Sequence, residues 1–175
     1  MTNRWMQQRL AMVAIAGCLL AGIPAATHAQ GLPGLTIFGG PGAGNELRYR
    51  LDFGGRANGW DRYRLRIPAK KLNLAAARFT VTYSDNFQGE FDPNRMEVRV
   101  KGKKIEMDEV VWDRENRRLE FYPVEPVPAG SPVEIILSNV KNPSFGGMYY
   151  FNAQIETPGD VPLLRYLGTW VITIS

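Results

Sequence analysis

The segment Glu46-Leu47-Arg48-Tyr49-Arg50-Leu51-Asp52-Phe53 alternates charged and apolar side chains without interruption. Successive side chains of a β-strand point to opposite faces, so the segment predicts a strand with one apolar and one charged face. The next segment repeats the pattern, with Tyr63, Leu65 and Ile67 set between arginines. Pro68 ends it, because proline has no N–H to donate to a neighbouring strand.

Further segments of this kind follow to the end of the chain. They are expected at 79–83, 96–100, 105–112, 119–122, 133–137, 148–155 and 167–174. Lys101-Gly102-Lys103 and the stretch 113–116 have the composition of hairpin turns. Helix is expected only within 70–77, as one short turn, with an extended crossover as the alternative. About eight or nine short strands predict an all-β, antiparallel, immunoglobulin-like β-sandwich over residues 46–175.

The first 29 residues have a different character. Arg4 and Arg9 precede an apolar stretch from Leu10 to Ile23, and small residues lead up to Ala29. This layout predicts a secretory signal peptide cleaved between Ala29 and Gln30. The apolar stretch is shorter than the roughly 20 residues of a spanning helix, which argues against a membrane anchor. Residues 30–45 are rich in glycine and proline and predict a flexible lead-in, with a short edge strand at 35–38 as an option.

A lipid anchor is the alternative fate of the N-terminus. Ile15-Ala16-Gly17-Cys18 matches the small residues that precede a lipidated cysteine. The apolar residues Leu19 and Leu20 follow Cys18, where a polar tether is usual, and this argues against lipidation.

Removal of residues 1–29 changes the composition that bears on function. The segment contains two basic and no acidic side chains, so residues 30–175 carry 19 basic and 17 acidic ones, a net charge of +2. That balance is not typical of a nucleic-acid-binding protein. The only cysteine, Cys18, and the only histidine, His28, lie in this segment and are removed with it. Disulfides, thiol nucleophiles, histidine bases and zinc sites built on thiolate or imidazole are thereby excluded, and no cofactor is expected.

Several motifs, in order, resemble an exported cyanobacterial family, domain-of-unknown-function family 2808. They are Tyr63-Arg64-Leu65-Arg66-Ile67-Pro68, Phe91-Asp92-Pro93 before Val98-Arg99-Val100, Pro128-Ala129-Gly130, Asn139-Val140-Lys141-Asn142-Pro143, Gly146-Gly147-Met148-Tyr149-Tyr150-Phe151 and Leu167-Gly168-Thr169-Trp170. The resemblance covers nearly all of the chain after residue 29. It implies export, a β-sandwich and a cell-envelope setting, and it brings no catalytic residues because the family has no assigned activity.

An arginine stripe is the main candidate site. If the first two strands pair as a hairpin, five guanidinium groups share one face, those of Arg48, Arg50, Arg62, Arg64 and Arg66. Arginine binds carboxylates, sulfates and phosphates in a bidentate manner, which suits an acidic envelope polysaccharide or a lipid headgroup. The alternative is a solvated face whose arginines pair with Glu46, Asp52, Asp61 and neighbouring acids.

Two carboxylate groupings are weaker candidates. Asp85, Glu90 and Asp92, with Asn86 and Asn94, offer oxygen ligands for calcium, although these residues are also standard turn formers. A hydrolase would need two carboxylates across a cleft. The carboxylates available for it are Glu106, Asp108, Glu109, Asp113 and Glu115. Strand alternation spreads them over both faces and a loop, so we expect no enzymatic activity.

The aromatic side chains offer a sugar-stacking platform as a further option. They are Trp60, Tyr63, Trp112, Tyr122, Tyr149, Tyr150, Tyr166 and Trp170. Tyr149 and Tyr150 are adjacent, so one of them is expected at the surface. The sequence as a whole predicts an exported, non-enzymatic envelope module, periplasmic or secreted, with association with the outer membrane as an option. Its expected partners are an anionic polysaccharide or an envelope protein, with no nucleic acid and no membrane span after cleavage.

Overall fold

The computed structural model describes residue 42 and residues 44–175. The predicted signal segment with its cleavage at Ala29 and Gln30, Cys18, the option of a strand at 35–38 and most of the lead-in 30–45 lie outside the described residues.

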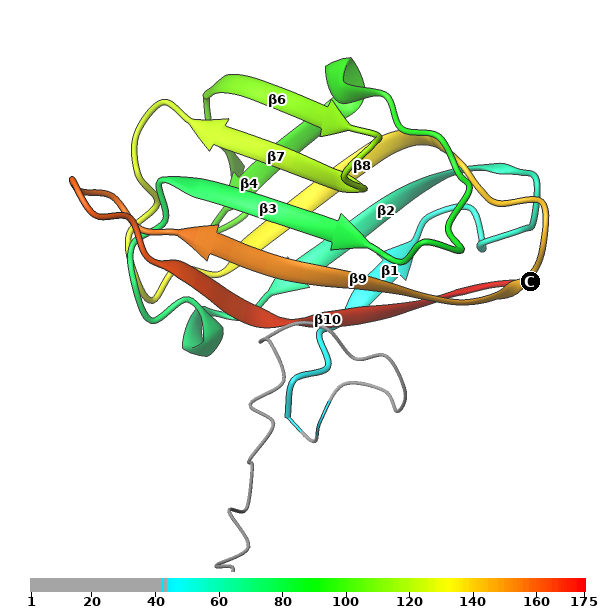
Figure 1. The fold of residues 1–175 in the computed structure, drawn as a ribbon, viewed down its shortest axis with the longest axis horizontal. Coiled ribbons are helices and arrows are strands. Elements are labelled where there is room, and N and C mark those ends of the chain that lie inside the picture. The colour runs from blue at the N-terminus through cyan, green and yellow to red at the C-terminus, as the bar shows by residue number, and fades with distance from the viewer. Residues whose placement is uncertain (1–41, 43) are drawn as a thin grey trace, which may run out of the picture. The chain divides into compact units, whose positions relative to one another are not determined.

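Two five-stranded antiparallel sheets pack face to face (Figure 1). The first sheet has the order β1 (Tyr49–Leu51), β2 (Trp60–Ile67), β8 (Val133–Lys141), β4 (Met96–Val100) and β5 (Lys103–Lys104). The second has the order β10 (Leu164–Ile174), β9 (Gly147–Glu156), β3 (Arg78–Tyr83), β7 (Arg118–Pro123) and β6 (Met107–Asp113). The predicted antiparallel β-sandwich is confirmed.

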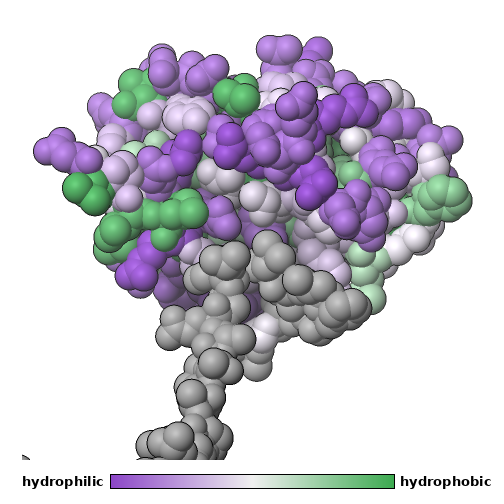
Figure 2. All heavy atoms as spheres, viewed as in Figure 1, coloured by the Kyte–Doolittle hydropathy of each residue, from purple (hydrophilic) through white to green (hydrophobic). Residues whose placement is uncertain are grey.

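The core consists of the inward-facing side chains of both sheets. Its largest fully buried members are Trp170, Tyr63, Phe79, Phe121 and Phe151. All strands and every buried core residue of the described chain lie within residues 45–175, so residues 30–175 contain the complete sandwich. Hydrophilic side chains cover most of the face seen in Figure 2. Within the described residues, no helix combines the length and apolarity that crossing a bilayer requires.

The first predicted strand, 46–53, is divided between the two sheets. Tyr49–Leu51 pairs with β2, whereas the backbone N–H of Leu47 donates to the carbonyl of Thr169 in β10 at 2.8 Å. The edges of the two sheets therefore meet along β1 and β10. Gly168 permits this contact, because a Cβ there would lie 2.5 Å from the Asn45 carbonyl oxygen.

The described residues form ten strands, against the about eight or nine that were expected. The additional short strand is β5, which pairs with β4 after the predicted turn. Lys101 and Gly102 adopt φ values of 51° and 80°, which the tight hairpin requires. The expected helical turn is a 3-10 helix at Ala69–Lys71, η1. A second one, η2 at Pro93–Arg95, lies where a plain loop was expected.

Candidate anion-binding face

The pairing of β1 with β2 brings the arginine stripe onto one face of the first sheet. Arg50 lies directly opposite Arg64, and the backbone N–H of Arg66 donates to the carbonyl of Arg48 at 3.0 Å. Tyr63, Leu65 and Ile67 of β2 are buried on the opposite side of the sheet. The hairpin on which the stripe depends therefore forms, and its arginines point away from the core.

The neighbouring strands extend the positive charge of this face. Arg99 of β4 lies opposite Lys104 of β5, two strands away from the stripe. We define the basic face by its seven cations, Arg48, Arg50, Arg62, Arg64, Arg66, Arg99 and Lys104. Its three carboxylates, Asp52, Glu97 and Glu134, form ion pairs with these cations. The face thus has an excess of four positive charges.

Asp52 is the centre of the largest ion-pair group. Its carboxylate lies 2.9 Å from Nε of Arg64, 3.2 Å from Nε of Arg50 and 3.8 Å from a terminal nitrogen of Arg62. Hydrogen bonds from the guanidinium to Asp52 raise the pKa of Arg64 above its ordinary value. One carboxylate therefore orders three arginines without neutralising all of them.

Ile136 lies beneath these charged side chains. It is on the outward side of β8, opposite Arg64 on one flank and Glu97 on the other, yet it is only 3% exposed. The aliphatic stems of long charged side chains cover apolar surface in this way while their charged ends remain in water. The guanidinium groups of the basic face are consequently held against the sheet.

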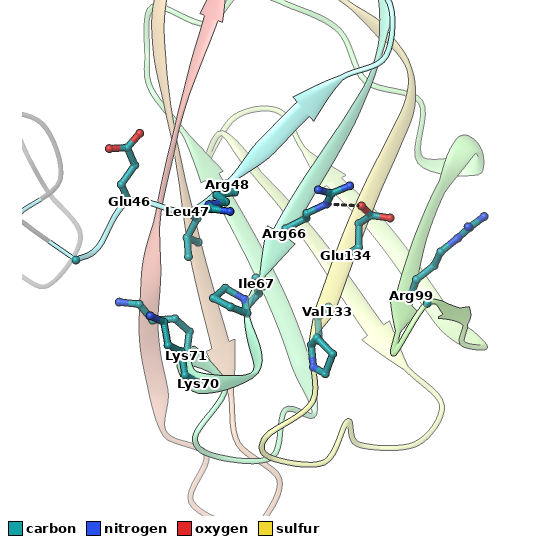
Figure 3. A pocket seen from close by; sticks show the side chains of 14 residues that line it. Glu46, Leu47, Arg48, Arg66, Ile67, Lys70, Lys71, Arg99, Val133 and Glu134 are labelled. Carbon is teal, nitrogen blue, oxygen red and sulfur yellow. Dashed lines mark hydrogen bonds and ion pairs between the residues drawn. The ribbon is translucent and has the colours of Figure 1, made fainter.

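A hollow of about 700 Å³ opens at the end of the basic face, where β2 ends and β8 begins. Figure 3 shows Arg48 and Arg66 on adjacent segments, Lys70 and Lys71 on the turn after β2, and Arg99 across the hollow on β4. Two carboxylates, Glu46 and Glu134, also line the hollow. Arg66 donates to Glu134 at 2.9 Å, and Lys71 donates to the side-chain oxygen of Asn45 at 3.2 Å. Arg48 and Lys70 form no ion pair with any described residue, so their charges are available to a ligand.

The geometry suits multivalent binding of anions. Guanidinium and ammonium groups at several points of one surface contact successive carboxylates, sulfates or phosphates of a polymer. Each exposed contact is weak and screened by salt, so affinity arises from their number. Sequence reasoning found the five arginines but missed Arg99, Lys104 and Lys70, since neither sheet order nor the position of the turn after β2 is readable from strand spacing.

The weaker candidates are arranged as parts of turns and strands. Asp92 accepts hydrogen bonds from the Asn94 backbone and from Asn139, as the N-cap of η2. Within the described part of the chain, no three acidic side chains come together in a way that would hold a metal ion. The calcium site at Asp85, Glu90 and Asp92 stays a prediction.

The carboxylates considered for hydrolysis lie on or beside β6. Glu109 is opposite Tyr122, and Asp113 is opposite Arg118, with which it forms an ion pair at 3.1 Å. Among the aromatic side chains, Tyr63, Tyr149 and Trp170 are buried in the core. Tyr150 lies on the other side of β9 from Tyr149, as alternation predicted, but it is half-buried and not fully exposed.

A comparison with known protein families identifies the family to which this chain belongs. The family described as "Protein of unknown function (DUF2808)" matches residues 35–174. The chain belongs to this family. The resemblance read from its motifs is thereby confirmed at the level of the family, and DUF2808 carries no activity to transfer to the basic face. A comparison with curated proteins finds no match.

This DUF2808 protein is similar to several solved structures at low sequence identity. The structure of BslA, a bacterial hydrophobin, has a TM-score of 0.45 and 14% identity over 74% of this chain and 97% of the other. A collagen-binding domain from a Staphylococcus aureus adhesin has a TM-score of 0.42 and 11% identity, covering 73% and 95%. An uncharacterised Nocardia farcinica protein with an immunoglobulin-like fold has a TM-score of 0.43 and 12% identity, covering 74% and 98%.

Proposed function

We propose that this protein is an exported, non-catalytic module of the cell envelope that binds an anionic polymer through its basic face. The observation that carries the proposal is the grouping of seven cations with only three carboxylates on one sheet face. Residues 30–175 as a whole have a net charge of only +2, so the positive charge is concentrated on this face. A concentrated positive surface attracts and orients a polyanion.

The preferred ligand class is an acidic polysaccharide. The seven cations of the basic face lie on β1 and the residues just before it, on β2, on β4 and on β5, and Lys70 extends them onto the turn that contains η1. This makes an extended surface instead of a single deep pocket. A linear chain of carboxylated or sulfated sugars presents its charges at a similar series of points. Among the described residues, Arg48 and Lys70 in the hollow have neither a carboxylate partner nor a side-chain hydrogen bond, whereas Lys71 is bonded to Asn45. Arg48 and Lys70 are therefore expected to contribute most to binding.

Binding is tested with residues 30–175 and polygalacturonate, with neutral dextran as the uncharged polymer. We expect binding at about 0.05 M salt that is lost at about 0.5 M, because exposed charge pairs are screened. The variant Arg48→Gln/Lys70→Gln should bind at least about fivefold more weakly. Its matched control, Arg114→Gln/Arg117→Gln, removes the same charge from exposed positions of the β6–β7 turn and should bind as the parent does.

Two results would reject the basic face as the binding site. One is the absence of binding to polygalacturonate and to dextran sulfate at low salt. The other is an equal loss of affinity in the two double variants, which would show a response to net charge alone.

Export is tested separately from binding. The signal-like pattern of residues 1–29 supports it, and cell fractionation followed by N-terminal sequencing checks it. The expected product begins at Gln30 and is found outside the cytosol. A full-length chain confined to the cytosol would refute export. That result would not decide whether the basic face binds a polyanion.

A further inference from the structure

One end of the sandwich displays large apolar side chains to solvent. Phe53 and Trp60 lie at the two ends of the β1–β2 loop, and Phe145 and Met148 lie in and beside the β8–β9 loop. They are 61%, 55%, 78% and 58% exposed. Both loops are found at the end of the molecule where the chain terminates in Figure 1, and Figure 2 shows hydrophobic side chains at that end. We call these four residues the apolar tip.

The two loops of the apolar tip are joined by backbone hydrogen bonds. The N–H of Asn58 donates to the Pro143 carbonyl at 2.8 Å, and the N–H of Asn142 donates to the Gly59 carbonyl at 2.8 Å. Trp60 lies opposite Lys141 in the register of β2 and β8. The loops consequently form one surface and not two independent protrusions.

Buried polar side chains hold this surface in place. The described residues include six buried polar or charged side chains. Two of them, Asp61 and Asn142, form hydrogen bonds with the loop between β1 and β2. Asp61 accepts the backbone N–H groups of Phe53 and Gly55, at 2.9 and 2.7 Å. Asn142 donates to the Arg56 carbonyl at 2.8 Å and accepts from the hydroxyl of Tyr63 at 2.6 Å. The loops are ordered by the fold itself, so a partner that covers the tip has little loop entropy to remove.

The two loops of the apolar tip carry cations. The ionisable side chains within residues 53–60 and 141–148 are Arg56 and Lys141. Acidic residues border these loops, since Glu90 pairs with Lys141 through its backbone and Asp52 precedes Phe53. The ammonium group of Lys141 lies 5.3 Å from the centre of the Trp60 ring, and the guanidinium of Arg62 lies 6.0 Å from that of Phe53. Aromatic side chains beside cations are the combination that suits the interface of an anionic bilayer.

We propose that the apolar tip docks onto the surface of a lipid bilayer that contains anionic headgroups. Phe145, Met148, Phe53 and Trp60 would enter the boundary between headgroups and acyl chains, while Arg56 and Lys141 contact phosphate. A second copy of the chain fits less well, because two such tips would bring cations against cations. The proposal does not depend on polysaccharide binding, which uses the cations further along the sheet.

Vesicle flotation with residues 30–175 tests the proposal. The probes are phosphatidylcholine vesicles with about one-third phosphatidylglycerol and vesicles of phosphatidylcholine alone. We expect binding to the anionic vesicles and at least about tenfold weaker partitioning of Phe145→Ser/Met148→Ser. The matched control Val161→Ser/Leu163→Ser removes apolar side chains of similar exposure, 80% and 53%, from the β9–β10 turn at the other end of these strands. It should bind as the parent does.

Fluorescence locates the contact independently. Trp60 should shift its emission to shorter wavelength when anionic vesicles are added, whereas Trp170 is already fully buried. A Trp60→Phe variant should keep binding vesicles and lose the shift. Unfolding curves of the variants that match the curve of the parent show that the sandwich is intact.

Three results would overturn the proposal. They are no flotation with anionic vesicles, equal loss of flotation in the tip variant and the control variant, and a dimer in sedimentation velocity that Phe145→Ser/Met148→Ser converts to a monomer while vesicle binding is absent.

Discussion

The carboxylate of Asp61 accepts a hydrogen bond from the backbone N–H of Gly55 at 2.7 Å, in a position where Asp61 is only 1% exposed. The same carboxylate also accepts the N–H groups of Phe53 and Arg62. A single buried side chain thus satisfies three backbone donors of the segment that carries part of the apolar tip. A buried charge is tolerated only with such compensation.

Asp61→Asn should therefore destabilise the fold although it preserves the shape of the side chain. The amide offers an N–H₂ group where an oxygen accepted an N–H donor, and a buried donor left without a partner costs about 1–3 kcal/mol. We expect the free energy of unfolding to fall by about that amount in urea titrations. Asp160→Asn, the same change at an exposed turn position, is the control and should have no measurable effect. Equal stability of the two variants would contradict the role assigned to Asp61.

Gly168→Ala should open the contact between β1 and β10. The new Cβ would lie 2.5 Å from the Asn45 carbonyl oxygen and 2.8 Å from Cγ of Leu47, so the chain before β1 has to move. We expect a loss of about 1–3 kcal/mol, the range for overpacked sites. Gly42→Ala is the control, because its Cβ would meet only a side-chain atom at 4.0 Å. Hydrogen exchange at the Leu47 amide should rise in Gly168→Ala and stay unchanged in the control.

Ile136→Ala should behave as a core substitution although Ile136 faces outward. Because Arg64 and Glu97 flank it and it is 3% exposed, truncation leaves a space under the charged layer. We expect a loss of about 2 kcal/mol, and a larger loss for Ile135→Ala, which points into the core. Val161→Ala, at an exposed position, should be neutral. If Ile136→Ala were as neutral as Val161→Ala, the charged side chains would not be packed on the sheet.

Asp52→Asn should increase the affinity for polygalacturonate. The change removes the carboxylate that engages Arg50, Arg62 and Arg64, and so adds a positive charge and frees three guanidinium groups. We expect about threefold tighter binding at about 0.05 M salt and a smaller gain at 0.5 M, measured by calorimetry. Asp113→Asn adds the same charge beside Arg118 on the other sheet and should change little. Equal gains in both variants would assign the effect to net charge.

The protein should lose stability at alkaline pH because of Tyr63. Burial, and next the charge of Asp61, raise the pKa of the Tyr63 phenol far above its ordinary value of 10.0. The unfolded chain releases this proton near pH 10 while the folded chain keeps it, so the stabilisation is complete below pH 10 and declines as pH rises. The decline from this group is about 1.4 kcal/mol per pH unit.

Tyr63→Phe removes that titration. The variant should be less stable at pH 7 by about 1 kcal/mol, because the side-chain oxygen of Asn142 no longer accepts a hydrogen bond from the Tyr63 hydroxyl. Its free energy of unfolding should then fall less steeply above pH 10, so that the curves of variant and parent converge. Parallel curves from pH 9 to 11.5 would show that Tyr63 does not titrate differently in the two states.

The sequence by itself determined the fold class, most of the strands and the family. Alternation at Glu46–Phe53 and Arg62–Ile67 is a local property, because the geometry of a strand directs neighbouring side chains to opposite faces wherever the strand is placed. The turn at Lys101 and Gly102 is equally local, since it depends on the backbone freedom of a few residues. The same reasoning placed the five arginines of β1 and β2 on one face, because the two strands are consecutive.

Only the tertiary structure decided which strands are neighbours, and with it the extent of both candidate surfaces. Arg99 joins the basic face because β8 lies between β2 and β4, far from both in the sequence. Phe145 joins Phe53 and Trp60 because residues 58–60 pair with residues 141–143. Such contacts depend on how two sheets bury their apolar faces together, which is a property of the whole chain. The outward-facing Ile136 is buried where alternation alone would place it in solvent, because the neighbouring strands β2 and β4 place the charged side chains of Arg64 and Glu97 on either side of it.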